Sequence, residues 1–278
     1  MNRGSLYIVA TPIGNLNDMS ARAVETLRAV ALIAAEDTRH SSRLLQHFGI
    51  NTPMQSLHDF NETERVEKIL AQLGHGASVA LISDAGTPLI SDPGYRLVQM
   101  ARAQGFEVVP IPGPCALIAA LCAAGLPSDR FIFEGFLPAK ANARQQHLKS
   151  LQNEIRTLIF YEAPHRILVA IEDMMLIFGA DRVAVIAREL TKTFETIKDG
   201  TLKDLHDWLI ADLNQQKGEF VILVKGAEKS APDENDPALT ILDILLTELP
   251  VKQAAQLASK ITGVKKNWLY EQALRKKL

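Results

Sequence analysis

The stretch Val79-Ala-Leu-Ile-Ser-Asp-Ala-Gly-Thr-Pro-Leu-Ile-Ser-Asp-Pro-Gly94 indicates an α/β fold. Its first four residues are wholly apolar, as expected for a buried strand, and a loop rich in glycine and proline follows directly. Asp92 and Pro93 suit the start of a helix, and Gly105 suits its end. A buried strand that leads through such a loop into a helix is typical of parallel α/β sheets.

Segments typical of strands and of helices alternate in the same way along most of the chain. Ser20 resembles an N-cap, and further helices are expected near 164–178 and 202–213. Six more segments have the composition of strands: Leu6–Ala10, Glu107–Pro110, Phe131–Phe136, Thr157–Tyr161, Val183–Ala187 and Glu219–Val224. We therefore predict an α/β protein with largely parallel strands, divided into two α/β domains at residues 1–120 and 121–228.

The C-terminal part of the chain has a different composition. The polar, acidic segment Glu228–Pro237 resembles a linker, and residues 236–278 predict a small helical domain. Its segments Gln253–Ile261 and Asn267–Leu274, joined by a turn at Gly263, suit either a helix-turn-helix pair or a simple helical tail.

Composition narrows the class of protein. The 278 residues carry a net charge of −2 and are 47% hydrophobic, which is typical of a soluble globular protein and neither requires nor excludes a nucleic-acid partner. The longest apolar run is too short to cross a bilayer, and the N-terminus lacks the features of a secretory signal. Cys115 and Cys122 are expected to be buried apolar residues rather than a disulfide or metal pair. We predict a cytoplasmic protein that neither associates with a membrane nor binds a metal ion.

Five loops rich in glycine, proline or polar residues follow predicted strands. They are Thr11–Asn15, Glu36–Arg39, Ser83–Gly94, Pro112–Ala116 and Glu162–Arg166. Each alone would only turn the chain, but ligands of parallel sheets bind beyond the carboxyl ends of the strands, so together they predict a cleft. They hold few cations and no G-x-x-x-x-G-K-[ST] motif, which disfavours a nucleoside triphosphate. The first loop has one glycine and no G-x-G-x-x-G, which disfavours a dinucleotide.

Several motifs, taken in order, resemble a known family. They are Val9-Ala-Thr-Pro-Ile-Gly-Asn-Leu16, Ala35-Glu-Asp-Thr-Arg39, the Ser83–Gly94 loop, Ile111-Pro-Gly-Pro-Cys-Ala116, Phe160-Tyr-Glu-Ala-Pro-His-Arg166 and Arg188-Glu-Leu-Thr-Lys-Thr-Phe-Glu195. The set covers about residues 5–226 and resembles the tetrapyrrole-methylase-like (class III) methyltransferases, in particular members that modify small-subunit ribosomal RNA.

The resemblance implies two α/β domains, a homodimer, and S-adenosylmethionine bound between the domains. It implies methylation of a cytidine ribose 2′-oxygen in the decoding region of 16S ribosomal RNA. It also implies a cofactor site formed by Pro12, Asp84, Ala85, Gly86, Thr87, Ile90, Cys115, Ala116, Tyr161, Glu162 and Leu190. Many tetrapyrrole-methylating relatives have Gly-Asp-Pro where this chain has Gly86-Thr87-Pro88, so Asp84 becomes the nearest substitute for that acid. We expect the Ser83–Gly94 loop to contact the cofactor mainly through its main chain.

The catalytic candidates are charged residues in the predicted strand-end loops. A ribose hydroxyl needs a group that removes its proton as the new bond forms, and a cation that holds the nearby phosphate would help. The candidates are Glu36, Asp37, Arg39, Glu162, His165 and Lys192. Alternatively, Asp37 and Arg39 form an ion pair that fixes their loop, His165 caps or packs its helix, and Lys192 belongs to a solvated set of salt bridges with Glu189 and Glu195.

Two groups of basic residues are the expected contacts for RNA, and a solvated surface is the alternative for both. The groups are Lys140, Arg144, Lys149 and Arg156, and Lys265, Lys266, Arg275, Lys276 and Lys277. Two other functions stay open: methylation of a small molecule or protein by the same fold, and a noncatalytic, cofactor-binding factor for ribosome assembly.

Overall fold

The structure is a computed structural model that describes residues 3–57, 62–228 and 237–275, with the side chains of residues 62–64 left out. It separates into two compact units, Met1–Gly226 and Ala227–Leu278, called here the N-terminal and C-terminal units. Most of the predicted acidic linker, and the predicted RNA contacts Lys276 and Lys277, lie outside the described residues.

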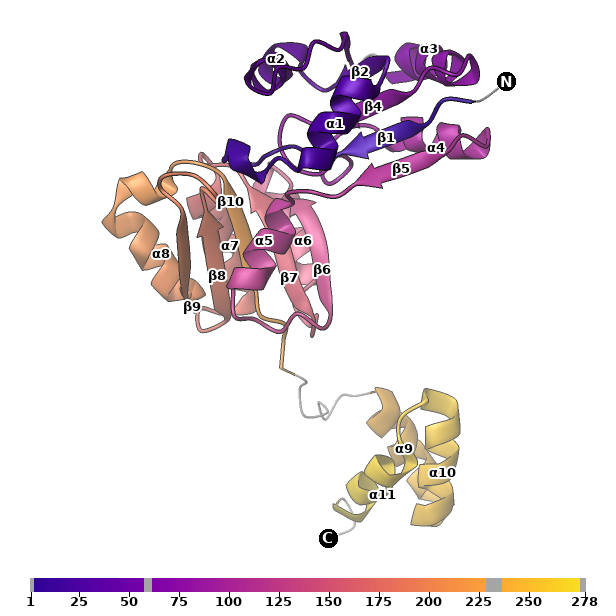
Figure 1. The fold of residues 1–278 in the computed structure, drawn as a ribbon. Coiled ribbons are helices and arrows are strands. Elements are labelled where there is room, and N and C mark those ends of the chain that lie inside the picture. Colours follow the sequence, from indigo (N-terminus) through magenta and orange to yellow (C-terminus); the bar gives the residue numbers. More distant parts are fainter. Residues whose placement is uncertain (1–2, 58–61, 229–236, 276–278) are drawn as a thin grey trace. The chain divides into compact units, whose positions relative to one another are not determined.

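The first sheet of the N-terminal unit is wholly parallel, as predicted. Its strands follow the order β3-β2-β4-β1-β5 (Figure 1). They are β1 (Leu6–Val9), β2 (Leu32–Ala35), β3 (Met54–Ser56), β4 (Val79–Ile82) and β5 (Val108–Ile111). Helices α1 (Ala21–Ala29) and α2 (Thr38–His47) pack on one face, and α3 (Glu62–Gly74) and α4 (Tyr95–Ala103) on the other. Strand order reverses beside β1, so the loops after β1 and β4 meet.

The second sheet corrects the prediction of largely parallel pairing. Its order is β6-β7-β10-β8-β9, and only β6 and β7 pair in parallel. The strands are β6 (Phe131–Phe136), β7 (Thr157–Glu162), β8 (Val183–Arg188), β9 (Thr196–Thr201) and β10 (Phe220–Val224). The strands β7 and β8 run in the same direction, as a strand–helix–strand unit requires, but β10 inserts between them in the opposite direction.

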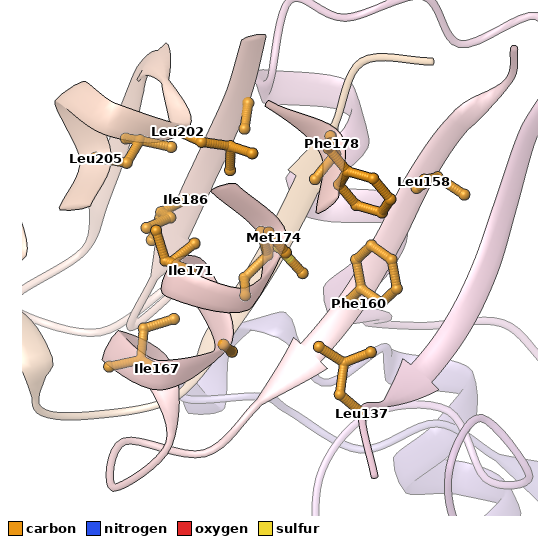
Figure 2. Close-up of a cluster of buried hydrophobic side chains, with 14 of the residues drawn as sticks. Leu137, Leu158, Phe160, Ile167, Ile171, Met174, Phe178, Ile186, Leu202 and Leu205 are labelled. Carbon is orange, nitrogen blue, oxygen red and sulfur yellow. The ribbon is translucent and has the colours of Figure 1, made fainter. Parts of the chain in front are cut away.

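Two apolar layers sandwich the second sheet. On one face, α6 (Ala141–Ser150), α7 (Ile167–Phe178) and α8 (Leu202–Ala211) cover a cluster that includes Phe160, Ile171 and Met174 (Figure 2). On the other face, α5 (Ala116–Ala123) packs through Leu117 and Ala120. Two 3₁₀ turns, Leu16–Asp18 and Leu213–Gln216, complete the unit. The predicted domain boundary at residue 120 falls inside α5 and stays a prediction.

The ends of the helices follow local chemistry. The Ser20 side chain accepts from the Ala23 N–H at 3.1 Å, which confirms the predicted cap of α1. Helix α8 begins with a capping box between Thr201 and Asp204. The predicted start of α4 at Asp92 is wrong: Gly94 occupies the N-cap position at φ 121°, with no side-chain cap. A Cβ there would lie 2.6 Å from Leu81 Cδ2, so the close approach to β4 requires glycine.

The C-terminal unit consists of three described helices: α9 (Pro237–Glu248), α10 (Val251–Thr262) and α11 (Lys266–Arg275). Gly263, in the left-handed conformation at φ 74°, ends α10 and provides the predicted turn. The helices share a small core of leucine and alanine side chains that includes Leu242, Ala255 and Leu269. Among the described residues, no helix combines the length and the apolar character that a bilayer crossing requires.

Candidate functional site

A cavity of about 380 Å³ lies in the N-terminal unit, where loops of the first sheet meet the edge of the second. The loops after β1, β2, β4 and β5 contribute one wall, and the ends of β6, β7, β8 and β10 contribute the other. Its lining residues are Ile13, Glu36, Asp84, Ala85, Gly86, Thr87, Ile90, Ser91, Asp92, Cys115, Ala116, Phe136, Tyr161, Glu162, Ala163, Pro164, Ala187, Leu190, Glu219, Phe220 and Val221. This is the strand-end cleft that the loop pattern predicts.

Two hydrogen bonds fix the loop after β4 against the loop after β1. The Thr11 N–H donates to the Gly86 carbonyl at 2.8 Å, and the Gly86 N–H donates to the Thr11 carbonyl at 3.0 Å. Gly86 adopts φ +85°, which favours glycine. Both of its main-chain groups are used within the protein, so main-chain contacts to a cofactor have to come from other residues of this loop. The Thr87 hydroxyl donates to the Pro114 carbonyl at 2.8 Å and ties in the loop after β5.

Glu162 is a buried carboxylate with one oxygen left for a ligand. Its side chain is 1% exposed, and Oε1 lies 2.6 Å from Arg166 Nη2 and accepts from the Ala163 N–H at 2.8 Å. Oε2 is buried without a hydrogen-bond partner. A buried oxygen of this kind is costly unless something donates a hydrogen bond to it, so a ligand with an N–H or O–H group would satisfy it.

A charged network supports the wall made by β8 and β10. Lys192 Nζ donates to Glu189 Oε1 at 2.9 Å and to Glu219 Oε2 at 2.8 Å. The two carboxylates raise the pKa of Lys192 although partial burial opposes them. The Thr191 hydroxyl accepts from the Asn15 N–H at 3.1 Å, so the loop after β8 also contacts the loop after β1.

The charges on the cavity wall are all negative. Five lining residues carry carboxylates, and none of the described lining residues is a lysine, arginine or histidine. The pKa of Asp92 is raised to about 6, mainly by burial and also by the neighbouring charges of Glu36 and Asp84, although a hydrogen bond with Ser83 opposes the shift. The cavity therefore suits a ligand with positive charge and disfavours a polyphosphate.

Aromatic side chains form the floor between β6 and β7. Tyr161 packs edge-on against Phe133 and Phe136, with ring centroids 4.9 and 5.7 Å apart. Its hydroxyl accepts from the Leu117 N–H at 3.1 Å, and burial holds the pKa of Tyr161 above its usual range. Phe136 lines the cavity while 52% of its surface is exposed, so it lies at the rim.

Most predicted cofactor residues meet at this cavity. Of those predicted, only Pro12 does not line it; the residues that do are Asp84, Ala85, Gly86, Thr87, Ile90, Cys115, Ala116, Tyr161, Glu162 and Leu190. Of the predicted catalytic residues, Glu36 and Glu162 line the cavity, and Asp37, Arg39, His165 and Lys192 do not.

Asp37 and Arg39 have local roles in the structure. Asp37 caps α2 by accepting from the Arg39 N–H at 2.8 Å, and this hydrogen bond lowers the pKa of Asp37. The Asp37 N–H in turn donates to Asp84 Oδ1 at 3.1 Å, which positions a cavity carboxylate. The Arg39 side chain is 93% exposed, with Nε 3.6 Å from Asp37 Oδ1. His165 is exposed next to the cavity residue Pro164.

Several lining residues escaped the sequence analysis. Ser91 and Asp92 belong to the quoted loop, in which Leu89 and Ser91 adopt left-handed φ angles of 73° and 70°. Phe220 and Val221 begin β10 rather than end it, and Glu219 directly precedes that strand. The strand-end rule would have found Phe136, but no sequence signal marks the start of an inserted antiparallel strand.

The first predicted RNA-contacting group needs a correction. Arg144 is buried, with Nε 2.6 Å from Asp173 Oδ2, so it is part of the structure of the second sheet rather than an RNA contact. Arg156 pairs with Glu154 at 2.7 Å, while Lys140 and Lys149 are exposed. Among the described residues, no group of three or more histidine, cysteine or acidic residues has the arrangement of a metal site.

Comparison with known proteins identifies the family. The model of the tetrapyrrole (corrin/porphyrin) methylases matches residues 5–206, and the model described as the RsmI C-terminal HTH domain matches residues 231–277. The chain therefore belongs to the tetrapyrrole methylase family.

Curated relatives resemble nearly the whole chain. It is 61% identical to "Ribosomal RNA small subunit methyltransferase I" of Pseudomonas aeruginosa, with 99% of each chain covered. It is 56% identical to the protein of the same name from Escherichia coli O157:H7, covering 98% of this chain and 96% of the relative. The solved structure of a cobalt precorrin-4 methyltransferase matches with a TM-score of 0.59 and 17% identity, over 80% of this chain and 94% of that one. This last similarity concerns the fold alone.

Proposed function

We propose that the protein transfers a methyl group from S-adenosylmethionine to small-subunit ribosomal RNA. The observation that carries the proposal is a cavity whose charged lining residues, among those described, are all acidic. It lies at the switch point of a methylase fold, in a chain similar over nearly its full length to relatives named for this reaction. A cavity of about 380 Å³ is in the range of small-molecule sites.

The residues of the cavity fit the methyl donor. S-adenosylmethionine supplies an electrophilic methyl group on a positively charged sulfur. The carboxylates Glu36, Asp84 and Asp92 favour a cation, and the free Oε2 of Glu162 offers an acceptor to an ammonium or hydroxyl group. Apolar side chains such as Ile13, Ile90 and Leu190 suit the flat faces of a nucleoside.

The residues outside the cavity support those inside it. Lys192 holds Glu219 and Arg166 holds Glu162, so both cations act as positioning residues for carboxylates of the wall. Asp37 has the same role toward Asp84 through its main chain. Of the predicted catalytic residues, we retain Glu36 and Glu162 as groups that touch donor or acceptor.

The finer assignment is methylation of a cytidine ribose 2′-oxygen in the decoding region. It is supported by the resemblance to members of the family that modify ribosomal RNA. A ribose hydroxyl loses its proton as the new carbon–oxygen bond forms, and a carboxylate in the cavity can accept it. Phe136, exposed at the rim, can stack on a base that leaves the RNA helix. We also propose a homodimer, to be tested by light scattering.

The test is transfer of label from S-adenosylmethionine to small ribosomal subunits or to free ribosomal RNA. A methylated ribose resists alkaline cleavage at the next phosphate, so alkaline hydrolysis separates ribose from base methylation. Glu162→Gln should reduce transfer by at least about tenfold, while Asp129→Asn, an exposed aspartate outside the cavity, should not. Label in a base or in protein would refute the ribose assignment. Donor binding without any transfer would indicate a noncatalytic assembly factor.

A further inference from the structure

The methyl donor and its product differ in charge at one atom, and the cavity is built to respond to that charge. Transfer breaks the bond between the methyl carbon and the positively charged sulfur, and the electron pair stays on sulfur. The methyl carbon bonds to the acceptor oxygen, whose proton leaves to a base or to water. Sulfur thereby changes from a cationic sulfonium to a neutral thioether, while the adenosine and amino-acid parts stay the same.

We propose that the carboxylates of the cavity bind the cationic methyl donor in preference to its neutral thioether product, and that the protonation of Asp92 sets the strength of this preference. The inference rests on the proposed function and adds a means of product release to it. Each turnover removes a positive charge from a site whose described lining residues offer only negative charges, so the product is the weaker ligand of the two.

The geometry places three carboxylates of the first half together. Glu36 follows β2, and Asp84 and Asp92 lie in the loop after β4. The charges of Glu36 and Asp84 both act on Asp92, and all three residues line the cavity. A bound cation relieves the repulsion among these carboxylates, whereas a neutral thioether leaves it in place.

The opposite wall gives an independent indication of a ligand that donates a hydrogen bond. The Glu162 side chain is 1% exposed, its Oε2 has no partner, and the residue lines the same cavity. Arg166 neutralises its other oxygen, and Lys192 does the same for Glu219. The carboxylates Glu162 and Glu219 each have a cation beside them, while Asp84 and Asp92 lie on the opposite wall.

The pKa of Asp92 is raised toward neutral pH. Burial is the main cause of its pKa of about 6, followed by the charges of Glu36 and Asp84, with the Ser83 hydroxyl acting in the other direction. Tyr161 of the second sheet lines the same cavity, and burial, with the charge of Asp92 contributing, holds the pKa of Tyr161 above its usual range, so that phenol stays neutral. A cation that favours the charged carboxylate lowers the pKa of Asp92 and releases a proton, and a neutral ligand does not.

Isothermal titration calorimetry of S-adenosylmethionine and S-adenosylhomocysteine between pH 5 and pH 7.5 tests the inference without any catalysis. If the donor lowers the pKa of Asp92 by about one unit, the ratio of donor affinity to product affinity is about fivefold larger at pH 7.5 than at pH 5. Titrations in two buffers of different ionisation enthalpy should then show release of about 0.4 protons at pH 6 for the donor only. The sulfonium charge lowers the pKa of the donor's own ammonium group relative to that of the product, so the same titrations of Asp92→Asn supply the correction for ligand ionisation.

Two variants complete the design. Asp92→Asn should bind both ligands with a pH-independent affinity ratio, while Asp129→Asn should keep the wild-type dependence. A ratio that is constant in the wild-type protein, or a pH dependence that survives in Asp92→Asn, overturns the inference. Failure of both ligands to bind at any pH would instead overturn the proposed function. The wild-type titrations decide the question even if the Asp92 variant fails to fold.

Discussion

Replacing Asp173 by alanine should destabilise the N-terminal unit far more than a surface substitution does. Asp173 Oδ2 lies 2.6 Å from Arg144 Nε, and Oδ1 accepts from Gln145 Nε2 at 2.7 Å. The pair joins α6 to α7 over the core of the second sheet, and its side chains are only 7% and 11% exposed. In the variant, the Arg144 guanidinium stays buried with one remaining acceptor, the Ala139 carbonyl at 3.2 Å.

The expected loss is about 4 kcal/mol. Removing one partner of a buried ion pair costs about 3–5 kcal/mol because the other charge stays buried and unpaired. Two hydrogen bonds to a charged group, at about 1.5–3 kcal/mol each, give a similar figure. Replacing both residues, as Arg144→Met with Asp173→Leu, removes the charges together and should recover most of the loss. The exposed pair of Lys203 and Asp207 provides the control, and Asp207→Ala should cost less than about 1 kcal/mol.

Urea unfolding followed by tryptophan fluorescence measures these differences. The two tryptophans lie in different units, Trp208 against the core of the second sheet and Trp268 against the core of the C-terminal unit. In a Trp268→Phe background, Trp208 alone reports on the N-terminal unit. A loss below about 1 kcal/mol for Asp173→Ala, or a double variant no more stable than the single one, would refute the assignment of Arg144 to the interior.

Three further outcomes follow from single positions. Gly86→Ala should cost about 1–2 kcal/mol of stability and weaken donor binding, because the residue adopts φ +85° and its Cβ would lie 3.3 Å from Ile13 Cγ2. Gly125→Ala is the control for the backbone cost alone, because Gly125 has φ +65° and open space around it. Equal effects of the two substitutions on donor binding would contradict this account. The pKa of Asp92 is raised on folding to about 6, so its ionisation opposes folding above pH 6 and this penalty fades as the pH falls toward 4. Asp92→Asn should therefore raise the unfolding free energy by about 1 kcal/mol at pH 7.5, a value already lowered to allow for solvent screening, and by little near pH 4. A loss of stability at pH 7.5 would contradict the raised pKa of Asp92. Thr201→Ala removes the capping box of α8 and should cost about 1 kcal/mol in the Trp208 assay, and no change in midpoint would argue against the cap.

Most of the first sheet could be predicted from sequence because its signals are local, but the short strand β3 was not among the predicted strands. The apolar run Val79–Ile82 and the loop after it fix both a buried strand and its direction toward the cavity. The pairing in the second sheet depends on contacts between distant segments, which periodicity does not reveal. The strand β9 was missed because its sequence, Thr196-Ile-Lys-Asp-Gly-Thr201, is polar and lies at an edge.

The same difference between local signals and distant contacts decides which residues of the candidate site could be predicted. Residues in strand-end loops, such as Glu36 and Glu162, were found because topology gathers such loops. The catalytic role predicted for Asp37 and Lys192 lacks support, because both residues contact partners inside the protein rather than line the cavity. The role of Asp92 depends on burial and on like charges nearby, and a sequence states neither.

The position of β10 also governs when the cavity can exist during synthesis. The first sheet is complete at residue 111, but the centre of the second sheet stays open until residues 220–224 have left the ribosome. The native pairings of β7 and β8 with β10 therefore cannot form until that strand, made about sixty residues after β7, is available. Because Glu219, Phe220 and Val221 come with that strand, the ligand site is the last part of the N-terminal unit to form.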